Sequence, residues 1–352
     1  MKITGLQSPI ARGVILALGS ALFFGASTPL LRYWGGGIGP WSSAALLYAG
    51  AALAGALFGG LRNESGRLGK GLTMRLWGAA ICGAALAPAA LAWGVQHTSA
   101  VSSSLMLNLE AVLTIGLAWL FYREHISSRV ASAAAIIVIG GAILVLERSE
   151  VGVAAVWGLL GVALATVLWA LDNTISRPLA DRDTATVVFR KSLIGVAISV
   201  CTTVIVGESL PRWTSAIALV LIGMLGYGVS LRLYLLSQRR IGVARTASVF
   251  AAGPFLGAAL AVAMGERSFS LWGLSGGLLI LLGVVLHVTE MHEHPHTHEE
   301  IEHEHAHHHA DGHHEHEHPD LVVGEHTHRH FHEGGSHTHA HAPDVHHLHD
   351  HE

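Results

Sequence analysis

Long stretches without a charged residue follow one another along the first 290 residues, and they limit what this chain can form. They include residues 33–61, 76–109 and 151–171. A helix that crosses a bilayer needs about 20 mostly apolar residues. The runs therefore predict an all-α polytopic membrane protein with ten spans, at about residues 13–34, 40–60, 74–94, 99–121, 130–147, 154–176, 187–206, 213–236, 244–264 and 268–289.

The basic residues predict how these helices are oriented. If the N-terminus is cytoplasmic, the inside segments hold 15 Lys and Arg residues and the outside segments hold 4. Cytoplasmic loops carry such an excess, so we expect a multi-pass protein of a bacterial-type inner (plasma) membrane with both termini in the cytoplasm. The first apolar run is followed at once by more spans, so no cleavable signal peptide is expected. Lys191 lies near a predicted cytoplasmic end, where its side chain can reach the lipid headgroups.

An internal repeat divides the apolar part of the chain. Residues 117–146 resemble residues 260–286, and in both a Glu follows a long helix with a Gly 17 residues later. Because five helices per half is an odd number, the second half is predicted to insert inverted relative to the first. Inverted repeats are the architecture of alternating-access transporters, with a site near the midplane. The predicted domains are a first repeat over 1–147, a second repeat over 148–290 and a tail over 291–352.

The segments that carry the repeat also resemble a known family. The stretches NLEAVLTIGLAWLFYREHIS and GVARTASVFAAGPFLGAALAVAMGERSF are similar to the two halves of an EamA-type transporter of the drug/metabolite transporter superfamily. The resemblance covers about residues 13–289 and implies ten helices, a five-plus-five inverted repeat and cytoplasmic termini. Such proteins often carry Pro where Ala111 stands, and here only the second half has it, as Pro254. The resemblance therefore implies a kink in the second half, while Pro29 and Pro88 can bend helices of the first half.

One acidic residue stands in the middle of the predicted helix over 99–121. An ionisable residue at the bilayer centre is costly, so Glu110 marks a candidate functional site. Ser99, Ser103 and Thr114 stand 11 and 7 residues before it and 4 after it, which is the spacing of one helical face. We expect this stripe to line a cavity where Glu110 couples a proton to transport or binds a cation. The alternative is a structural Glu that pairs with a neighbouring helix.

A second polar group lies toward the predicted cytoplasmic end of the helix over 154–176. It consists of Asp172 and Asn173, and Thr28 stands at a comparable depth in the partner helix of the other repeat. For Asp172 the sequence leaves a functional role and structural pairing equally open. No nucleophile–base set stands out, so no catalytic residue and no enzyme activity are predicted. The residues expected along the substrate and proton pathway are Glu110, Asn108, Ser103, Thr114, Asp172, Asn173 and Thr28.

The last part of the chain has a different composition. Residues 292–352 hold 24 histidines, and residues 291–352 hold 14 Asp and Glu against one Arg. Because so few apolar residues interrupt them, we expect a disordered tail in the absence of a ligand. Imidazole suits divalent Zn, Ni, Co and Cu, and the pattern HEHxH or HTHxH occurs five times. The predicted metal ligands are His292, His294, His296, His303, His305, His307, His314, His316, His318, His326, His328, His337 and His339.

These features favour a secondary active transporter that exports a small organic metabolite or drug and requires no cofactor. Its tail would bind metal as a regulator or buffer. The alternative is a divalent transition-metal (Ni, Co or Zn) efflux transporter whose tail collects its substrate. A more remote alternative is a membrane-anchored metal store or sensor, for which ten helices are more than an anchor needs. The expected partners are the lipid bilayer, the small-molecule substrate, protons and divalent metal ions, with no nucleic acid; a homodimer stays open.

Overall fold

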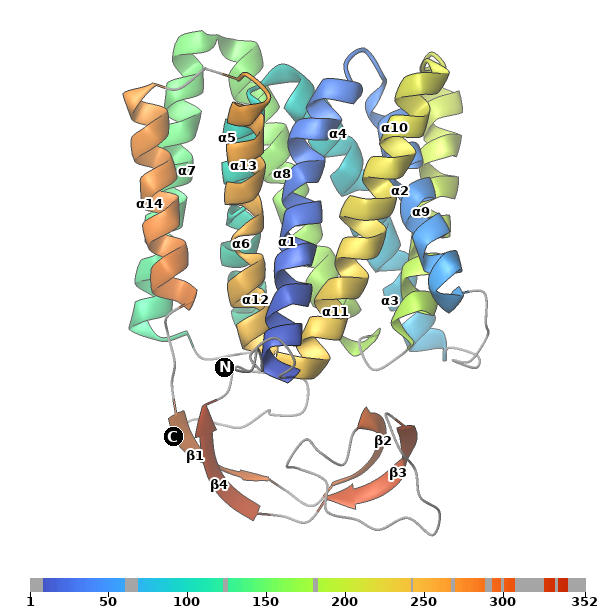
Figure 1. Cartoon of the computed structure of the whole chain (residues 1–352), viewed down its shortest axis with the longest axis vertical. Coiled ribbons are helices and arrows are strands. Elements are labelled where there is room, and N and C mark those ends of the chain that lie inside the picture. Colours follow the sequence, from blue (N-terminus) through green and yellow to red (C-terminus); the bar gives the residue numbers. More distant parts are fainter. Residues whose placement is uncertain are drawn as a thin grey trace, which may run out of the picture. The chain divides into compact units, whose positions relative to one another are not determined.

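The computed structural model consists of two compact units, Met1–Glu290 and Met291–Glu352, and each is described by itself. The first unit is a bundle of helices (Figure 1). The structure describes residues 9–60, 69–122, 126–179, 183–241, 243–266, 270–288, 293–298, 301–307, 326–332 and 335–340.

The helices of the bundle follow the predicted order of spans. The first half contains α1 (Pro9–Trp34), α2 (Pro40–Gly55), η1 (Ala56–Gly60), α3 (Lys70–Ala79), η2 (Ala80–Leu86), α4 (Ala87–His97), α5 (Ala100–Met106), α6 (Leu109–Tyr122) and α7 (Ser128–Val151). The second half contains α8 (Val153–Ser176), η3 (Arg177–Leu179), α9 (Thr184–Val206), α10 (Trp213–Gly223), η4 (Met224–Val229), α11 (Ser230–Ile241), α12 (Val243–Phe250), α13 (Gly253–Ala263) and α14 (Leu271–Val288).

The prediction of ten apolar spans is confirmed. In the part of the chain that the structure describes, eight helical stretches are long and apolar enough to cross a membrane. Two shorter apolar helices, Gly253–Ala263 and Leu271–His287, complete the set. The shorter helix over 253–263 is the second part of the span that was predicted over 244–264, because that span is divided into α12 and α13.

Local capping groups fix where several helices begin and end. Asp183 precedes α9 and accepts a hydrogen bond from the Thr186 N–H at 2.7 Å, and the helix ends at Gly207 with φ of 74°. That left-handed conformation is one that glycine adopts without strain. α2 is capped by a distant residue, because the Glu208 carboxylate accepts from the main-chain N–H groups of Trp41 and Ser42 at 3.1 and 2.7 Å. A carboxylate is favourable at a helix N-terminus, where main-chain donors lack partners.

Two departures from α-helix recur in both halves. The third span of each half contains a π-helical segment, η2 in one and η4 in the other. The fourth span of each half is broken, between α5 and α6 in one and between α12 and α13 in the other. π-helical turns often mark functional sites, and interrupted helices in corresponding positions mark the binding region of inverted-repeat transporters.

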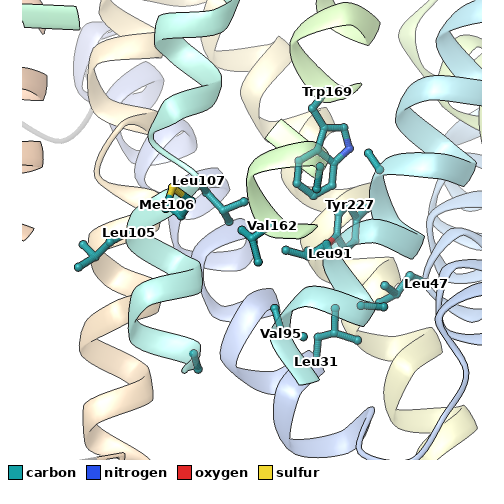
Figure 2. Close-up of a cluster of buried hydrophobic side chains, with 14 of the residues drawn as sticks. Leu31, Leu47, Leu91, Val95, Leu105, Met106, Leu107, Val162, Trp169 and Tyr227 are labelled. Carbon is teal, nitrogen blue, oxygen red and sulfur yellow. The ribbon is translucent and has the colours of Figure 1, made fainter. Parts of the chain in front are cut away.

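Glycines let helices from the two halves approach closely. A Cβ atom at Gly25 in α1 would lie 2.1 Å from the carbonyl oxygen of Gly253 in α13. A Cβ atom at Gly140 in α7 would lie 2.7 Å from the carbonyl oxygen of Gly276 in α14. Small residues are the usual means by which membrane helices pack backbone against backbone. Buried apolar side chains from helices of both halves form one cluster. Figure 2 shows part of it around Leu91, Val162 and Tyr227.

The structure describes four strands in the tail, and the disorder expected without a ligand stays a prediction. The strands are β1 (Glu293–His298), β2 (Ile301–His307), β3 (His326–His332) and β4 (Gly335–Ala340). β1 pairs with β4 and β2 pairs with β3, both antiparallel. The His-x-His alternation has the two-residue period of a strand, and pairing between segments gives the main chain hydrogen bonds that a single segment lacks.

Candidate functional site

The break between α5 and α6 lies next to Glu110. The Asn108 N–H and the Asn108 side-chain amide both donate to the Leu105 carbonyl oxygen, at 3.1 and 3.0 Å. In a continuous helix that oxygen accepts from residue 109. Asn side chains compete with the helix ladder in this way, so the span is interrupted here without a proline. Glu110 stands in the first turn of the helix that follows the break.

Glu110 hydrogen-bonds to the second half of the chain. The Asn173 side-chain amide in α8 donates to Glu110 Oε1 at 2.8 Å. Glu110 is half-buried and Asn173 is exposed on the bundle. The sequence prediction included both residues as site candidates, and the structure brings them together. The pair joins the broken fourth span of one repeat to the first span of the other.

Asp172, the neighbour of Asn173, forms an ion pair. Its Oδ2 atom contacts Lys191 Nζ of α9, and the two side chains are 5% and 14% exposed. Among the atoms that the structure describes, Asp172 Oδ1 has no hydrogen-bond partner. Lys191 therefore points into the bundle instead of reaching the lipid headgroups, which corrects our prediction for it. The reason is a buried carboxylate one helix away, whose position sequence spacing does not reveal.

The π-helical segment η2 holds a carbonyl oxygen in this region. The Gly83 carbonyl oxygen accepts hydrogen bonds from Tyr48 Oη at 2.5 Å and from Trp169 Nε1 at 3.1 Å. A Cβ atom at Gly83 would lie 1.9 Å from Asp172 Oδ2. Glycine is thus required here for the close approach of η2 to the carboxylate. These contacts tie η2 to α2 and α8 at the level of the ion pair.

Aromatic rings from both halves surround that carbonyl group. The ring centroid of Tyr227 in η4 lies 5.6 Å from that of Tyr48 and 6.2 Å from that of Trp169. Phe24 in α1 lies 6.1 Å from Trp169 and packs edge-on. Figure 2 shows Trp169 and Tyr227 beside each other above Leu91. Such pairs are favourable beyond the apolar area that they bury, so the cluster holds four helical segments together beside the polar pairs.

A cavity opens at the end of the bundle where α1 ends and α5 begins. Its volume is about 490 Å³. Residues of both halves line it, among them Arg32, Gln96 and Glu266. The Arg32 guanidinium donates to the Val95 carbonyl oxygen, and Glu266 Oε2 accepts from the Ala100 N–H at 3.0 Å. The cavity is therefore built from α1, α4, α5 and α13, with one cationic and one anionic side chain.

Of the predicted stripe on one helical face, only Thr114 stays in the same helix as Glu110, four residues after it. The structure corrects the prediction for Ser99 and Ser103, because the break separates α5 from the helix that holds Glu110 and Thr114. Ser99 caps α5, and its hydroxyl accepts from the Ser102 N–H at 2.9 Å. Among the described residues, the buried hydroxyls of Ser103 and Thr28 have no hydrogen-bond partner.

Sequence reasoning missed the residues that enclose the polar pairs. Tyr48, Gly83, Trp169 and Tyr227 carried no signal apart from their type, because each stands in an apolar run. Among the described residues of the bundle, no group of three or more His, Cys, Asp or Glu is arranged to hold a metal ion. The predicted metal ligands of the tail are considered from the backbone of its strands alone. His292, His314, His316 and His318 lie outside the described residues.

Known proteins match this chain in sequence and in fold. The family described as the EamA-like transporter family matches residues 11–146 and 156–289. A protein of Methanothermobacter thermautotrophicus, described as an uncharacterized transporter, is 27% identical over 213 residues, which are 59% of this chain and 62% of that protein. The chain thus covers less than two thirds of that relative. A solved crystal structure aligns over 79% of this chain and 97% of its own with a TM-score of 0.60 and 18% identity, which shows a shared fold.

Proposed function

This chain belongs to the EamA-like transporter family, and we propose that it exports a small organic solute in exchange for protons that Glu110 accepts and releases. The chain is a multi-pass membrane transporter and not an enzyme. We place it in a bacterial-type inner membrane with both termini in the cytoplasm, on the excess of Lys and Arg in the corresponding segments. The outward direction and the proton are part of the proposal.

The partner of Glu110 supports a role in proton exchange. Glu110 accepts a hydrogen bond from the uncharged amide of Asn173, whereas the neighbouring Asp172 is paired with a lysine. A cation beside a carboxylate holds it in the charged form, and an amide does so less strongly. The Glu110 carboxylate thus has an uncharged partner where that of Asp172 has a cation, which favours Glu110 as the group that exchanges protons. Its position beside a helix break, at the contact of the two repeats, is the single observation that carries the proposal.

The cavity supports a small organic solute as cargo. Its volume of about 490 Å³ falls in the range of small-molecule sites. Arg32 and Glu266 offer one charge of each sign on its wall. Because both halves line the cavity, a movement of one half against the other would change its shape.

The test is transport by the purified protein in proteoliposomes that contain a pH-sensitive dye. A panel of small organic amines, acids and zwitterions is added one compound at a time. We expect at least one compound to drive a proton flux with the wild type and none to do so with Glu110→Gln, because the amide cannot bind and release a proton. Glu110→Asp keeps the titratable group and should retain part of the flux. Unchanged flux in Glu110→Gln would remove Glu110 from the mechanism.

The second candidate is efflux of Ni, Co or Zn, and the histidine-rich tail favours it. In this case the tail would deliver the substrate. In the first case the tail would bind metal as a regulator or buffer of an organic-solute carrier. Both versions propose metal binding by the tail, since neutral imidazoles are good ligands for these ions, and both permit a homodimer.

A further inference from the structure

The strands of the tail pair in registers that set histidine opposite histidine. The antiparallel partners in β2–β3 and β1–β4 are the main-chain positions that face each other across each ladder. Five such positions have histidine on both strands, and they are His303–His330, His305–His328, His307–His326, His294–His339 and His296–His337.

These positions lie on one face of each ladder. Residues two apart on a strand share a face, and directly opposite residues share it too. We call the positions 303, 305, 307, 326, 328 and 330, where histidine is opposite histidine, the six-histidine face of β2–β3, and His332 lies on the same face opposite Ile301. The other face of that ladder carries different residue types, because Glu302 is opposite Phe331 and Glu304 is opposite Arg329. A register slip of one residue would move every histidine of that strand to the opposite face, so the observed register gathers them.

We propose that the six-histidine face is a site for a divalent transition-metal ion such as Zn²⁺, with ligands drawn from β2 and β3 together. Opposite residues of an antiparallel pair have Cβ atoms about 4.5–5.5 Å apart. Two imidazoles at that spacing can share one ion, whose bonds to nitrogen are about 2.0–2.1 Å long. A neighbouring pair on the same face or water completes four-coordination. The smaller set of paired histidines on β1–β4, at 294, 296, 337 and 339, with His298 on the same face, is a second site of the same kind.

This assignment deepens the proposed metal binding of the tail, because it names which segments bind the same ion. An ion held across the ladder would join residues 301–307 to residues 326–332 and would couple metal binding to strand pairing. The contrasting arrangement is local chelation, in which each HEHxH or HTHxH segment binds its own ion in a flexible chain. The two arrangements differ in whether the losses of Zn²⁺ binding add when two segments are changed together.

The experiment is a Zn²⁺ titration of the full-length protein in detergent, after removal of metal, in competition with a chromophoric chelator. One variant replaces the β2 positions 303, 305 and 307 with Gln, and a second replaces the β3 positions 326, 328 and 330. A third variant combines all six changes. The control variant replaces His346, His347 and His349, which lie outside the described residues of the tail.

With a shared site, each triple variant loses the same bound ion or weakens it on the order of tenfold or more. The sixfold variant then loses nothing further, because residues that act as a unit are not additive. The control variant binds as many Zn²⁺ ions tightly as the wild type does. Losses of Zn²⁺ binding that add between the two triple variants, or an equal loss in the control variant, would overturn the shared site. The readout is binding and not flux, so the site is judged independently of the transport proposal.

Discussion

At the scale of single residues, a buried ion pair fixes the polar centre of the bundle. Asp172 and Lys191 contact each other with little exposure, and Gly83 approaches the carboxylate so closely that no larger residue fits. Removing one partner of a buried pair leaves the other charge without compensation, which costs far more than removing both. The pair thus holds α8 against α9, while the adjacent Asn173 binds Glu110.

Neutralising one member of the pair should destabilise the bundle. We expect Asp172→Asn and Lys191→Met to lower the free energy of unfolding by about 3–5 kcal/mol each, and the double variant to recover most of that loss. Thermal unfolding in detergent, followed by tryptophan fluorescence, measures the change. Asp183→Asn is the matched control, because Asn caps a helix about as well as Asp. Single variants as stable as the wild type would show that the ion pair does not stabilise the fold.

At the scale of elements, the broken fourth spans have different local causes. α13 begins at Gly253 with Pro254 in its first turn, where a missing N–H is tolerated. The break before α6 has Asn108 instead of a proline. In the EamA resemblance only the fourth span of the second half has its usual proline, yet the fourth spans of both halves are interrupted. Corresponding breaks leave main-chain groups outside the regular helix ladder in both repeats, which is the arrangement that substrate sites of inverted-repeat transporters use.

The helix contact beside the second break should be sensitive to one methyl group. In Gly25→Ala the new Cβ would lie 2.1 Å from the Gly253 carbonyl oxygen, and backbone cannot give way as a side chain can. We expect overpacking to lower the free energy of unfolding by about 1–3 kcal/mol, which is measured as a lower melting temperature. Gly19→Ala in the same helix is the control, since its Cβ meets only the end of Leu233 at 3.3 Å. Equal melting temperatures for the two variants would contradict close packing of α1 on α13.

At the scale of the whole molecule, the chain joins a helical bundle of the EamA-like family to a separate histidine-rich unit. The boundary falls at residue 290, where the composition changes from a net excess of Lys and Arg to a net excess of Asp and Glu. The two units differ in what stabilises them. The bundle buries apolar side chains, whereas the tail has few apolar residues and depends on main-chain pairing and, by our proposal, on metal.

Deleting residues 291–352 should leave the bundle folded, because residues 1–290 form a compact unit of their own. We expect an unchanged melting temperature, loss of tight Zn²⁺ binding and continued flux of an organic solute. Uptake of labelled Ni, Co and Zn by proteoliposomes, with and without the tail and a proton gradient, separates the two candidate functions. Metal flux that depends on the tail would establish the metal exporter. A lower melting temperature after deletion would show that the tail supports the bundle.

The sequence by itself determined the ten spans, the boundary of the tail and the candidacy of Glu110. Each of these depends on local properties, namely the length of an apolar run, a change of composition and the cost of a charge in lipid. The EamA resemblance added the family. Asn173 was predicted as a site residue from its type and depth, but its contact with Glu110 was not.

Only the tertiary structure decided which residues meet. It turned Lys191 inward to Asp172, placed the Gly83 carbonyl oxygen between Tyr48 and Trp169, and set histidine opposite histidine in the tail. It also separated Ser103 from Glu110 at a break that no proline announced. The physical reason is that a partner is chosen by packing between segments far apart in the chain. Hydropathy and spacing along one segment carry no information about the neighbour that packing will supply.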